Sequence, residues 1–173
     1  TRFWPASRKD RPKQFLQLAA DRPLLRLTYE RLTPMVPPER TWVVTASSTV
    51  ALTRDLLPEL PEGNVLGEPA GRDTAACVGW AAEVLHRNDP EAVCLVLPAD
   101  HMIGDEEQFR TAMMVGVRQV EEHGGLLTFG LKPTAPETGF GYLEVGDVSG
   151  TINGHQVHSL SRFVEKPDAV TAQ

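Results

Sequence analysis

The chain has 173 residues, a formal net charge of -6 and an apolar fraction of 41%, which suit one globular domain or part of a larger one. The negative charge argues against broad nucleic-acid binding, because proteins that bind phosphate backbones usually carry a basic surface. The sequence has no run of about 18 apolar residues, so it predicts no transmembrane helix and no membrane partner.

The elements are predicted from periodicity and caps. Predicted helices cover 21–32, 47–57, 73–88 and 105–122, and predicted strands cover 41–45, 64–66, 92–97 and 126–129. The expected N-caps are Asp21, Ser47, Asp73 or Thr74, and Asp105. The apolar runs 92–97 and 126–129 are typical of strands buried in the sheet. In the last helix, a buried stripe of Phe109, Met113, Val117 and Val120 is expected, with Gly124-Gly125 as a left-handed stop.

The alternation of strands and helices predicts an α/β fold with a mixed, mostly parallel sheet flanked by helices. The pattern changes after about residue 133. Runs at 142–145 and 157–164 predict strands, and the turn Asn153-Gly154 separates them. We therefore expect an antiparallel extension of the sheet.

Cysteine and histidine give no metal pattern. Cys77 and Cys94 lack metal-type spacing and are expected to be reduced, buried thiols of a cytoplasmic protein. Solvent exposure is expected for four histidines, His86, His123, His155 and His158.

The N-terminal stretch is dense in positive charge within an acidic chain. Its cations are Arg2, Arg8, Lys9, Arg11 and Lys13. Fixed cations in a loop suit a polyphosphate, because arginine supplies forked donors and lysine a point charge. A disordered basic tail is the alternative, but Phe3, Trp4 and Phe15 make the stretch rather apolar for one.

Two further candidates follow predicted strands, where ligands of open parallel sheets sit. Asp100 comes after the run 92–97, and one carboxylate there can hold a Mg²⁺ ion that bridges phosphates. The alternative is a carboxylate that caps a turn. The loop from Glu68 to Thr74 leads into a helix and can offer N–H donors to an anion or a base, or be an ordinary capped loop.

The last candidates lie in the C-terminal extension. Gly141, in a glycine-rich turn, permits close approach of backbone to a ligand, or simply forms a hairpin turn or bulge. Glu165 can accept sugar hydroxyls and Lys166 can pair with a phosphate. A surface ion pair between these two is the alternative.

Together and in this order, these motifs are specific. They are T-R-F-W-P-A-S-R at 1–8, P-K-Q-F at 12–15, E-P-A-G-R-D-T-A at 68–75, L-P-A-D-H at 97–101, G-F-G-Y at 139–142 and F-V-E-K-P-D at 163–168. With them the chain resembles the sugar-1-phosphate nucleotidyltransferases and, within these, the mannose-1-phosphate guanylyltransferases. The resemblance spans the whole chain and implies a Rossmann-like, glycosyltransferase A-like nucleotidyltransferase domain.

The resemblance also implies the reaction and the roles. GTP and mannose 1-phosphate give GDP-mannose and pyrophosphate, by in-line attack of the sugar phosphate on the α-phosphorus. The implied nucleotide-binding residues are Arg2, Lys13, Glu68, Arg72, Thr74 and Asp100, of which Arg2, Lys13 and Asp100 are also catalytic and Asp100 binds the Mg²⁺ cofactor. Gly141 and Glu165 would bind the mannose hydroxyls, and Lys166 the sugar phosphate.

The chain also departs from the family pattern. The family has a first strand and a G-G-x-G run before Thr1, and further sugar contacts and a second metal-binding Asp after Gln173, so residues 1–173 resemble a partial domain with weak or no activity alone. Asp73 replaces a common Asn and Ala76 a common Pro, which leaves base choice open. Oligomer contacts, and the isomerase domain of some relatives, would lie outside this chain.

Two other functions remain open at this point. One is a nucleotidyltransferase for a different sugar 1-phosphate and nucleotide. The other is a non-catalytic regulatory homologue that binds a sugar nucleotide. The presence of Arg2, Lys13, Asp100, Glu165 and Lys166 argues against the second, because a regulator needs no charged catalytic cleft.

Overall fold

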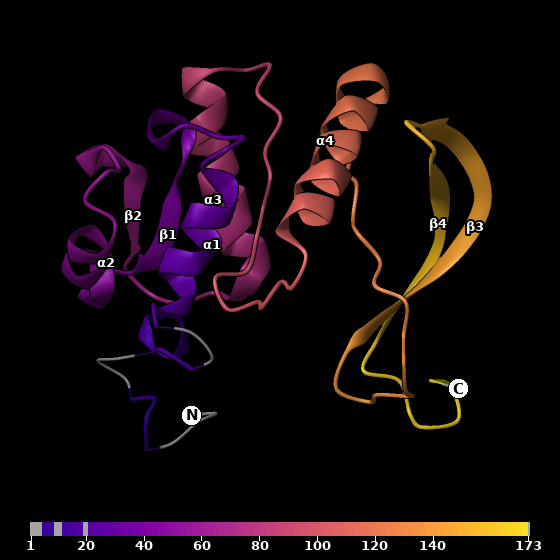
Figure 1. The fold of residues 1–173 in the computed structure, drawn as a ribbon, viewed down its shortest axis with the longest axis horizontal. Coiled ribbons are helices and arrows are strands. Elements are labelled where there is room, and N and C mark those ends of the chain that lie inside the picture. The colour runs from indigo at the N-terminus through magenta and orange to yellow at the C-terminus, as the bar shows by residue number, and fades with distance from the viewer. Residues whose placement is uncertain (1–4, 9–11, 19–20, 173) are drawn as a thin grey trace. The chain divides into compact units, whose positions relative to one another are not determined.

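The computed structural model describes residues 5–8, 12–18 and 21–172. The chain divides into two compact units, residues 1–110 and 111–173 (Figure 1). The first unit contains a parallel pair of strands and the second an antiparallel pair. This confirms an α/β fold with a parallel sheet and an antiparallel pair, and among the described residues each pair is a sheet of its own. Within the described parts of the chain, no helix is both long and apolar enough to cross a membrane.

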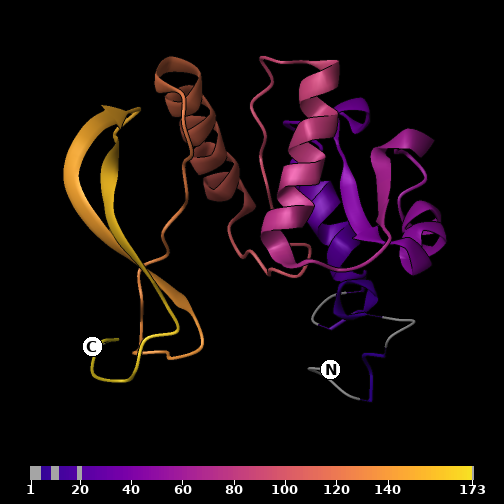
Figure 2. The ribbon, with the colours of Figure 1, turned by 180° about the vertical axis from the view of Figure 1, so that it is seen from behind.

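The parallel pair of the first unit has helices on both faces. Strands β1 (Val43–Ala46) and β2 (Val65–Glu68) pair in register from Val43 opposite Val65 to Ala46 opposite Glu68. The helices are α1 (Leu24–Leu32), α2 (Val50–Leu56) and α3 (Asp73–Asn88). Figure 1 shows α1 in front of the pair and α3 behind it, and Figure 2 shows the reverse. Helices on both faces of a parallel sheet are what the alternating sequence predicts.

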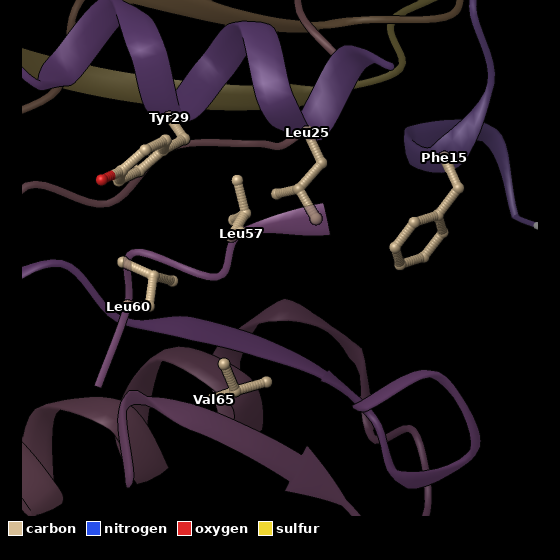
Figure 3. Packing of buried hydrophobic residues seen from close by; sticks show 6 residues of the cluster. All are labelled: Phe15, Leu25, Tyr29, Leu57, Leu60 and Val65. Carbon is tan, nitrogen blue, oxygen red and sulfur yellow. The ribbon is translucent and has the colours of Figure 1, made fainter. Parts of the chain in front are cut away.

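A small apolar core holds the first unit together. Its buried members are Phe15, Leu25, Tyr29, Leu57, Leu60 and Val65. Leu25 and Tyr29 point from α1 toward Leu57 and Leu60, while Val65 points toward them from β2 (Figure 3). Burial of each such side chain stabilises the fold by about 1.5–3 kcal/mol. Ala99 packs against the same core from the segment before Asp100.

Of the predicted caps, only Asp105 is confirmed. Its Oδ1 accepts a hydrogen bond of 2.9 Å from the Gln108 N–H at the start of α4 (Glu106–His123). Asp21 is not a cap, because α1 begins at Leu24 and its N-cap residue is Pro23, which makes no side-chain cap bond. Ser47 donates instead to the carbonyl of Glu68 at 2.7 Å.

The two remaining cap candidates are the first two residues of α3. Neither Asp73 nor Thr74 caps α3, because the N-cap residue is Arg72, which makes no side-chain cap bond. Asp73 is itself the first helical residue and has φ of 60°. A cap acts from outside the helix, so a residue already inside its first turn cannot serve as one.

The predicted strands 92–97 and 126–129 are wrong as paired strands. Both segments are described, and neither joins a ladder with another described residue. Val93, Leu95 and Leu97 are half-buried, but Val96 is 62% exposed. A strand buried on both faces needs strands beside it and cover on both sides, and the described residues cover one side only.

The two cysteines are both free. Cys77 is half-buried within α3 and Cys94 is exposed, so the predicted burial is wrong for Cys94. Cys94 alternates with the half-buried residues of the one-sided segment 92–97, which is why it faces outward.

The second unit contains most of α4 and a long hairpin. Strands β3 (Gly141–Ile152) and β4 (His155–Glu165) are antiparallel. Asn153 and Gly154 join them with φ of 49° and 82°, and two positive φ values are what a type I′ turn requires. The glycine stop of α4 is also confirmed, because Gly124 and Gly125 have φ of 69° and 84°.

The apolar stripe of α4 is only partly buried. Met113 is buried, while Phe109, Val117 and Val120 are half-buried. Gly116 lies on the covered side, where an added Cβ would come within 2.6 Å of the Phe129 ring. The segment 126–129 therefore packs on α4 even though it forms no ladder among the described residues.

Candidate functional site

Two of the residues expected to bind nucleotide and metal meet in the first unit. Lys13 Nζ donates a hydrogen bond of 3.0 Å to Asp100 Oδ2, across 87 positions of sequence. Both side chains are partly accessible, at 31% and 41% of their surface. A half-exposed ion pair contributes only about 0–1 kcal/mol to folding. The pair therefore adds little to stability, and its significance is that it places two opposite charges side by side.

The apolar core holds both members of this pair. Lys13 opens a short 3₁₀ turn, η1 (Lys13–Phe15), whose last residue lies in the core. The N–H of Leu24 donates to the carbonyl of Leu16 at 3.3 Å, which ties this turn to the start of α1. On the other side, Ala99 packs on the core immediately before Asp100. The two charges thus stand on segments anchored to one cluster.

The donor set at Asp100 suits a metal ion that arrives with phosphates. Among the described residues there is no group of three or more His, Cys, Asp or Glu side chains able to hold an ion. Mg²⁺ is commonly bound by one or two carboxylates together with substrate phosphates and waters. A single accessible carboxylate beside an ammonium group fits this mode of Mg²⁺ binding, and it does not fit a site whose ligands all come from the protein.

The predicted base-recognition loop leaves the end of β2. Its first residue, Glu68, is half-buried, and its carbonyl accepts the Ser47 hydroxyl bond. Just before it, an added Cβ on Gly67 would come within 2.8 Å of Val50 Cγ2, so β2 packs closely on α2. Arg72 and Thr74 are exposed beside the first turn of α3. Both are accessible to a ligand at the N-terminus of this helix.

Burial acts on the thiol of α3. It raises the pKa of Cys77, and the nearby charge of Glu68 raises this pKa further. A raised pKa keeps the thiol protonated, and a protonated thiol is a poor nucleophile. Cys77 is therefore a packing residue in this unit.

The predicted sugar-binding residues meet in the second unit. Gly141 pairs with Glu165 across the hairpin, and an added Cβ at Gly141 would lie 2.5 Å from Phe163 Cζ and 3.1 Å from Glu165 Oε2. Lys166 follows with φ of 46°, and its N–H donates to the Phe140 carbonyl at 3.0 Å. Its Nζ lies 3.5 Å from Glu165 Oε1, with both side chains exposed.

The site residues predicted from sequence therefore fall into two groups. Lys13, Glu68, Arg72, Thr74 and Asp100 belong to the first unit, and Gly141, Glu165 and Lys166 to the second. Arg2 lies outside the described residues.

Sequence reasoning missed Arg31, a charged residue buried close to Asp100. Its side chain is 3% exposed, and its Nη2 donates to the carbonyl of His101 at 3.3 Å. A signal for it was present, because Arg31 lies at helical spacing from Leu24 and Thr28 on the buried face of α1. A cation on such a face indicates a specific buried partner.

Comparison with known proteins agrees with these motifs. The family described as nucleotidyl transferase matches residues 1–173. The xanthan biosynthesis protein XanB of Xanthomonas campestris pv. campestris (strain B100) is 41% identical over 175 residues, covering 100% of this chain and 36% of that protein. A mannose-1-phosphate guanylyltransferase of Escherichia coli (strain K12) is 39% identical over 177 residues, covering 100% and 37%. The chain thus spans little more than a third of these relatives.

A solved structure has the same fold. It is named as a mannose-1-phosphate geranyltransferase from Thermus thermophilus, with a TM-score of 0.84 and 41% sequence identity. The match covers 98% of this chain and 48% of that one.

Proposed function

The chain belongs to the nucleotidyl transferase family, and from that premise we propose that the whole protein transfers GMP from GTP to mannose 1-phosphate. The products are GDP-mannose and pyrophosphate. A phosphate oxygen of mannose 1-phosphate bonds to the α-phosphorus of GTP, and the bond from that phosphorus to the bridging oxygen of pyrophosphate breaks. Such a transfer depends mainly on positioning and on stabilisation of charge.

The contact between Lys13 and Asp100 is the observation that carries this proposal. It places an ammonium group, which suits a phosphate, beside a carboxylate, which suits a divalent cation. Members of the family generally use a divalent metal ion, and we propose Mg²⁺ here. When bound, the ion would neutralise phosphate charge. Asp100 would hold the ion. Lys13 and Arg2 would bind the triphosphate and stabilise the negative charge that builds on the leaving pyrophosphate.

The remaining site residues would select the substrates. Glu68, Arg72 and Thr74 would surround the base at the loop before α3, where accessible side chains and helix N–H groups occur together. In the hairpin, the Glu165 carboxylate would accept hydrogen bonds from the mannose hydroxyls. Gly141 lies opposite Glu165 and has no Cβ that would clash with Phe163 or crowd this carboxylate. Lys166 would bind the sugar phosphate.

We also propose that the whole protein is cytoplasmic and that residues 1–173 form part of a nucleotidyltransferase domain with little activity alone. Self-association, if it occurs, would use surfaces outside this chain. Pyrophosphate release by the isolated chain at the rate of the whole protein would contradict the proposed dependence on further segments.

A panel of nucleotides tests the function. Pyrophosphate release is measured for the whole protein with Mg²⁺, mannose 1-phosphate and each of GTP, ATP, dTTP and UTP. The proposal predicts release with GTP well above the other three. Release with a different nucleotide would mean that the loop from Glu68 to Thr74 selects another base. Tight nucleotide binding with no release in any mixture would indicate a regulatory homologue.

A further inference from the structure

Arg31 is a buried cation whose partners only partly compensate its charge. Its side chain is 3% exposed, yet Nε has no hydrogen-bond partner among the described residues and lies 3.9 Å from Glu106 Oε1. The guanidinium also stacks over the Phe109 ring at 5.4 Å. Burial lowers the pKa of Arg31, which agrees with this poor compensation. A charge in this setting costs stability unless it serves another purpose.

The Arg31 side chain donates a hydrogen bond to the loop that carries Asp100. Its Nη2 donates to the carbonyl of His101, the next residue after Asp100. The described segment 99–105 contains neither helix nor strand, so no ladder fixes its path. Ala99 anchors this segment on the core side. Arg31 anchors it immediately beyond Asp100, so the carboxylate stands between two attachments to the first unit.

The same arginine connects α1 with the start of α4. Glu106 and Phe109 face its guanidinium, and Arg110 donates to the Arg31 carbonyl at 3.4 Å. Arg110 also donates to Glu106 Oε2 at 3.4 Å. The loop from 99 to 105 is thus held at its far end by contacts that converge on Arg31.

We propose that Arg31 is a positioning residue that fixes the turn at Asp100 and His101, and thereby the presentation of the Asp100 carboxylate to a nucleotide-bound divalent ion. This inference rests on the proposed function. Removal of a residue that orients a metal ligand without contacting the metal commonly lowers metal affinity about 10–100-fold. Because Arg31 contacts the carbonyl of the neighbouring residue, and not the carboxylate, we expect the lower end of this range.

Stability and metal affinity should respond differently to the loss of Arg31. Replacement of buried ionic groups by apolar side chains of similar volume is often neutral or stabilising, provided that no partner is left as a buried, uncompensated charge. The partner Glu106 is 47% exposed, so it would not be left buried. Arg31→Met should therefore leave the Tm unchanged or raise it, while metal affinity falls. A residue with a merely structural role would move both quantities in the same direction.

The test measures Mn²⁺ binding by electron paramagnetic resonance, on the whole protein with GTP and without mannose 1-phosphate. We expect Arg31→Met to raise the Mn²⁺ dissociation constant about 10-fold, with Arg31→Lys intermediate because it keeps one donor. The matched control is Arg26→Met on the same helix. Arg26 pairs with Glu30 and Glu59 rather than with the loop at Asp100, so this variant should lose Tm and keep Mn²⁺ affinity.

The outcomes separate the inference from the proposed function. GTP-dependent Mn²⁺ binding that is equal in wild type and Arg31→Met would overturn the inference alone. No GTP-dependent Mn²⁺ binding by wild type would remove the proposed function and the inference with it. If Arg31→Met does not fold, Glu106→Gln serves instead, because Glu106 is 47% exposed. A smaller loss of affinity in that variant supports the inference, and unchanged affinity contradicts it.

Discussion

The ammonium group of Lys13 and the carboxylate of Asp100 neutralise each other across a 3.0 Å hydrogen bond. In the proposed reaction these charges would have separate partners, the phosphates for Lys13 and a divalent ion for Asp100. Their contact thus holds both groups in place before either substrate binds.

Loss of the Lys13 charge should impair the reaction more than the fold. Lys13→Met should lower kcat for pyrophosphate release about 100-fold, the usual scale for one donor that stabilises developing charge. Lys13→Arg should retain part of the activity. The control is Lys132→Met, an exposed lysine of the second unit. Equal kinetics in Lys13→Met and wild type would exclude Lys13 from phosphate binding.

The hairpin makes a prediction about sugar binding. Gly141→Ala should raise the KM for mannose 1-phosphate, because the added Cβ meets Phe163 at 2.5 Å and crowds Glu165. The expected loss of stability is about 1 kcal/mol, at the lower end for overpacking, since Phe163 is exposed and able to move. Gly139→Ala is the matched control, because nothing lies within 4 Å of its added Cβ. Similar KM values for the two variants would argue against a sugar site here.

The core of the first unit should respond to a cavity. Leu57 is 1% exposed, so Leu57→Ala should lower the free energy of unfolding by about 2–5 kcal/mol. Urea unfolding measures this, with Leu52→Ala as a control at a site 38% exposed. A small effect at Leu57, similar to that at Leu52, would show that the core is not packed as described.

The ion pair between Glu59 and Arg26 predicts a pH dependence of stability. The hydrogen bond from Arg26 lowers the pKa of Glu59 below its ordinary value of 4.5. A lowered pKa in the folded state contributes stability above the unfolded pKa, and this contribution is lost as the pH falls through the folded pKa. The decrease in Tm between about pH 6 and about pH 3 should therefore be smaller for Glu59→Gln than for wild type. The same loss in both proteins would contradict this assignment.

Local sequence signals predicted the elements whose determinants are local. The turn at Asn153 and Gly154, the glycine stop of α4 and the cap at Asp105 depend on neighbouring residues, and all three are confirmed. Ser47 differs because its partner is Glu68, a contact that no local pattern shows. The apolar run at Val96 reads as a buried strand, but pairing depends on strands elsewhere.

The candidate site shows the same division. Sequence motifs indicated Lys13 and Asp100 separately, and their contact depends on how the core brings two distant segments together. Gly141 and Glu165 were also separate predictions, and the register of the hairpin makes them neighbours. Arg31 was missed because its importance comes from a carbonyl 70 positions away.

The most direct test of the central claim removes the carboxylate of Asp100 without changing its size. Pyrophosphate release from GTP and mannose 1-phosphate is measured for the whole protein with Asp100→Asn, beside Asp105→Asn, which removes a nearby carboxylate whose capping role Asn can perform. The account predicts release that collapses in Asp100→Asn and persists in Asp105→Asn. Full activity in Asp100→Asn would contradict it.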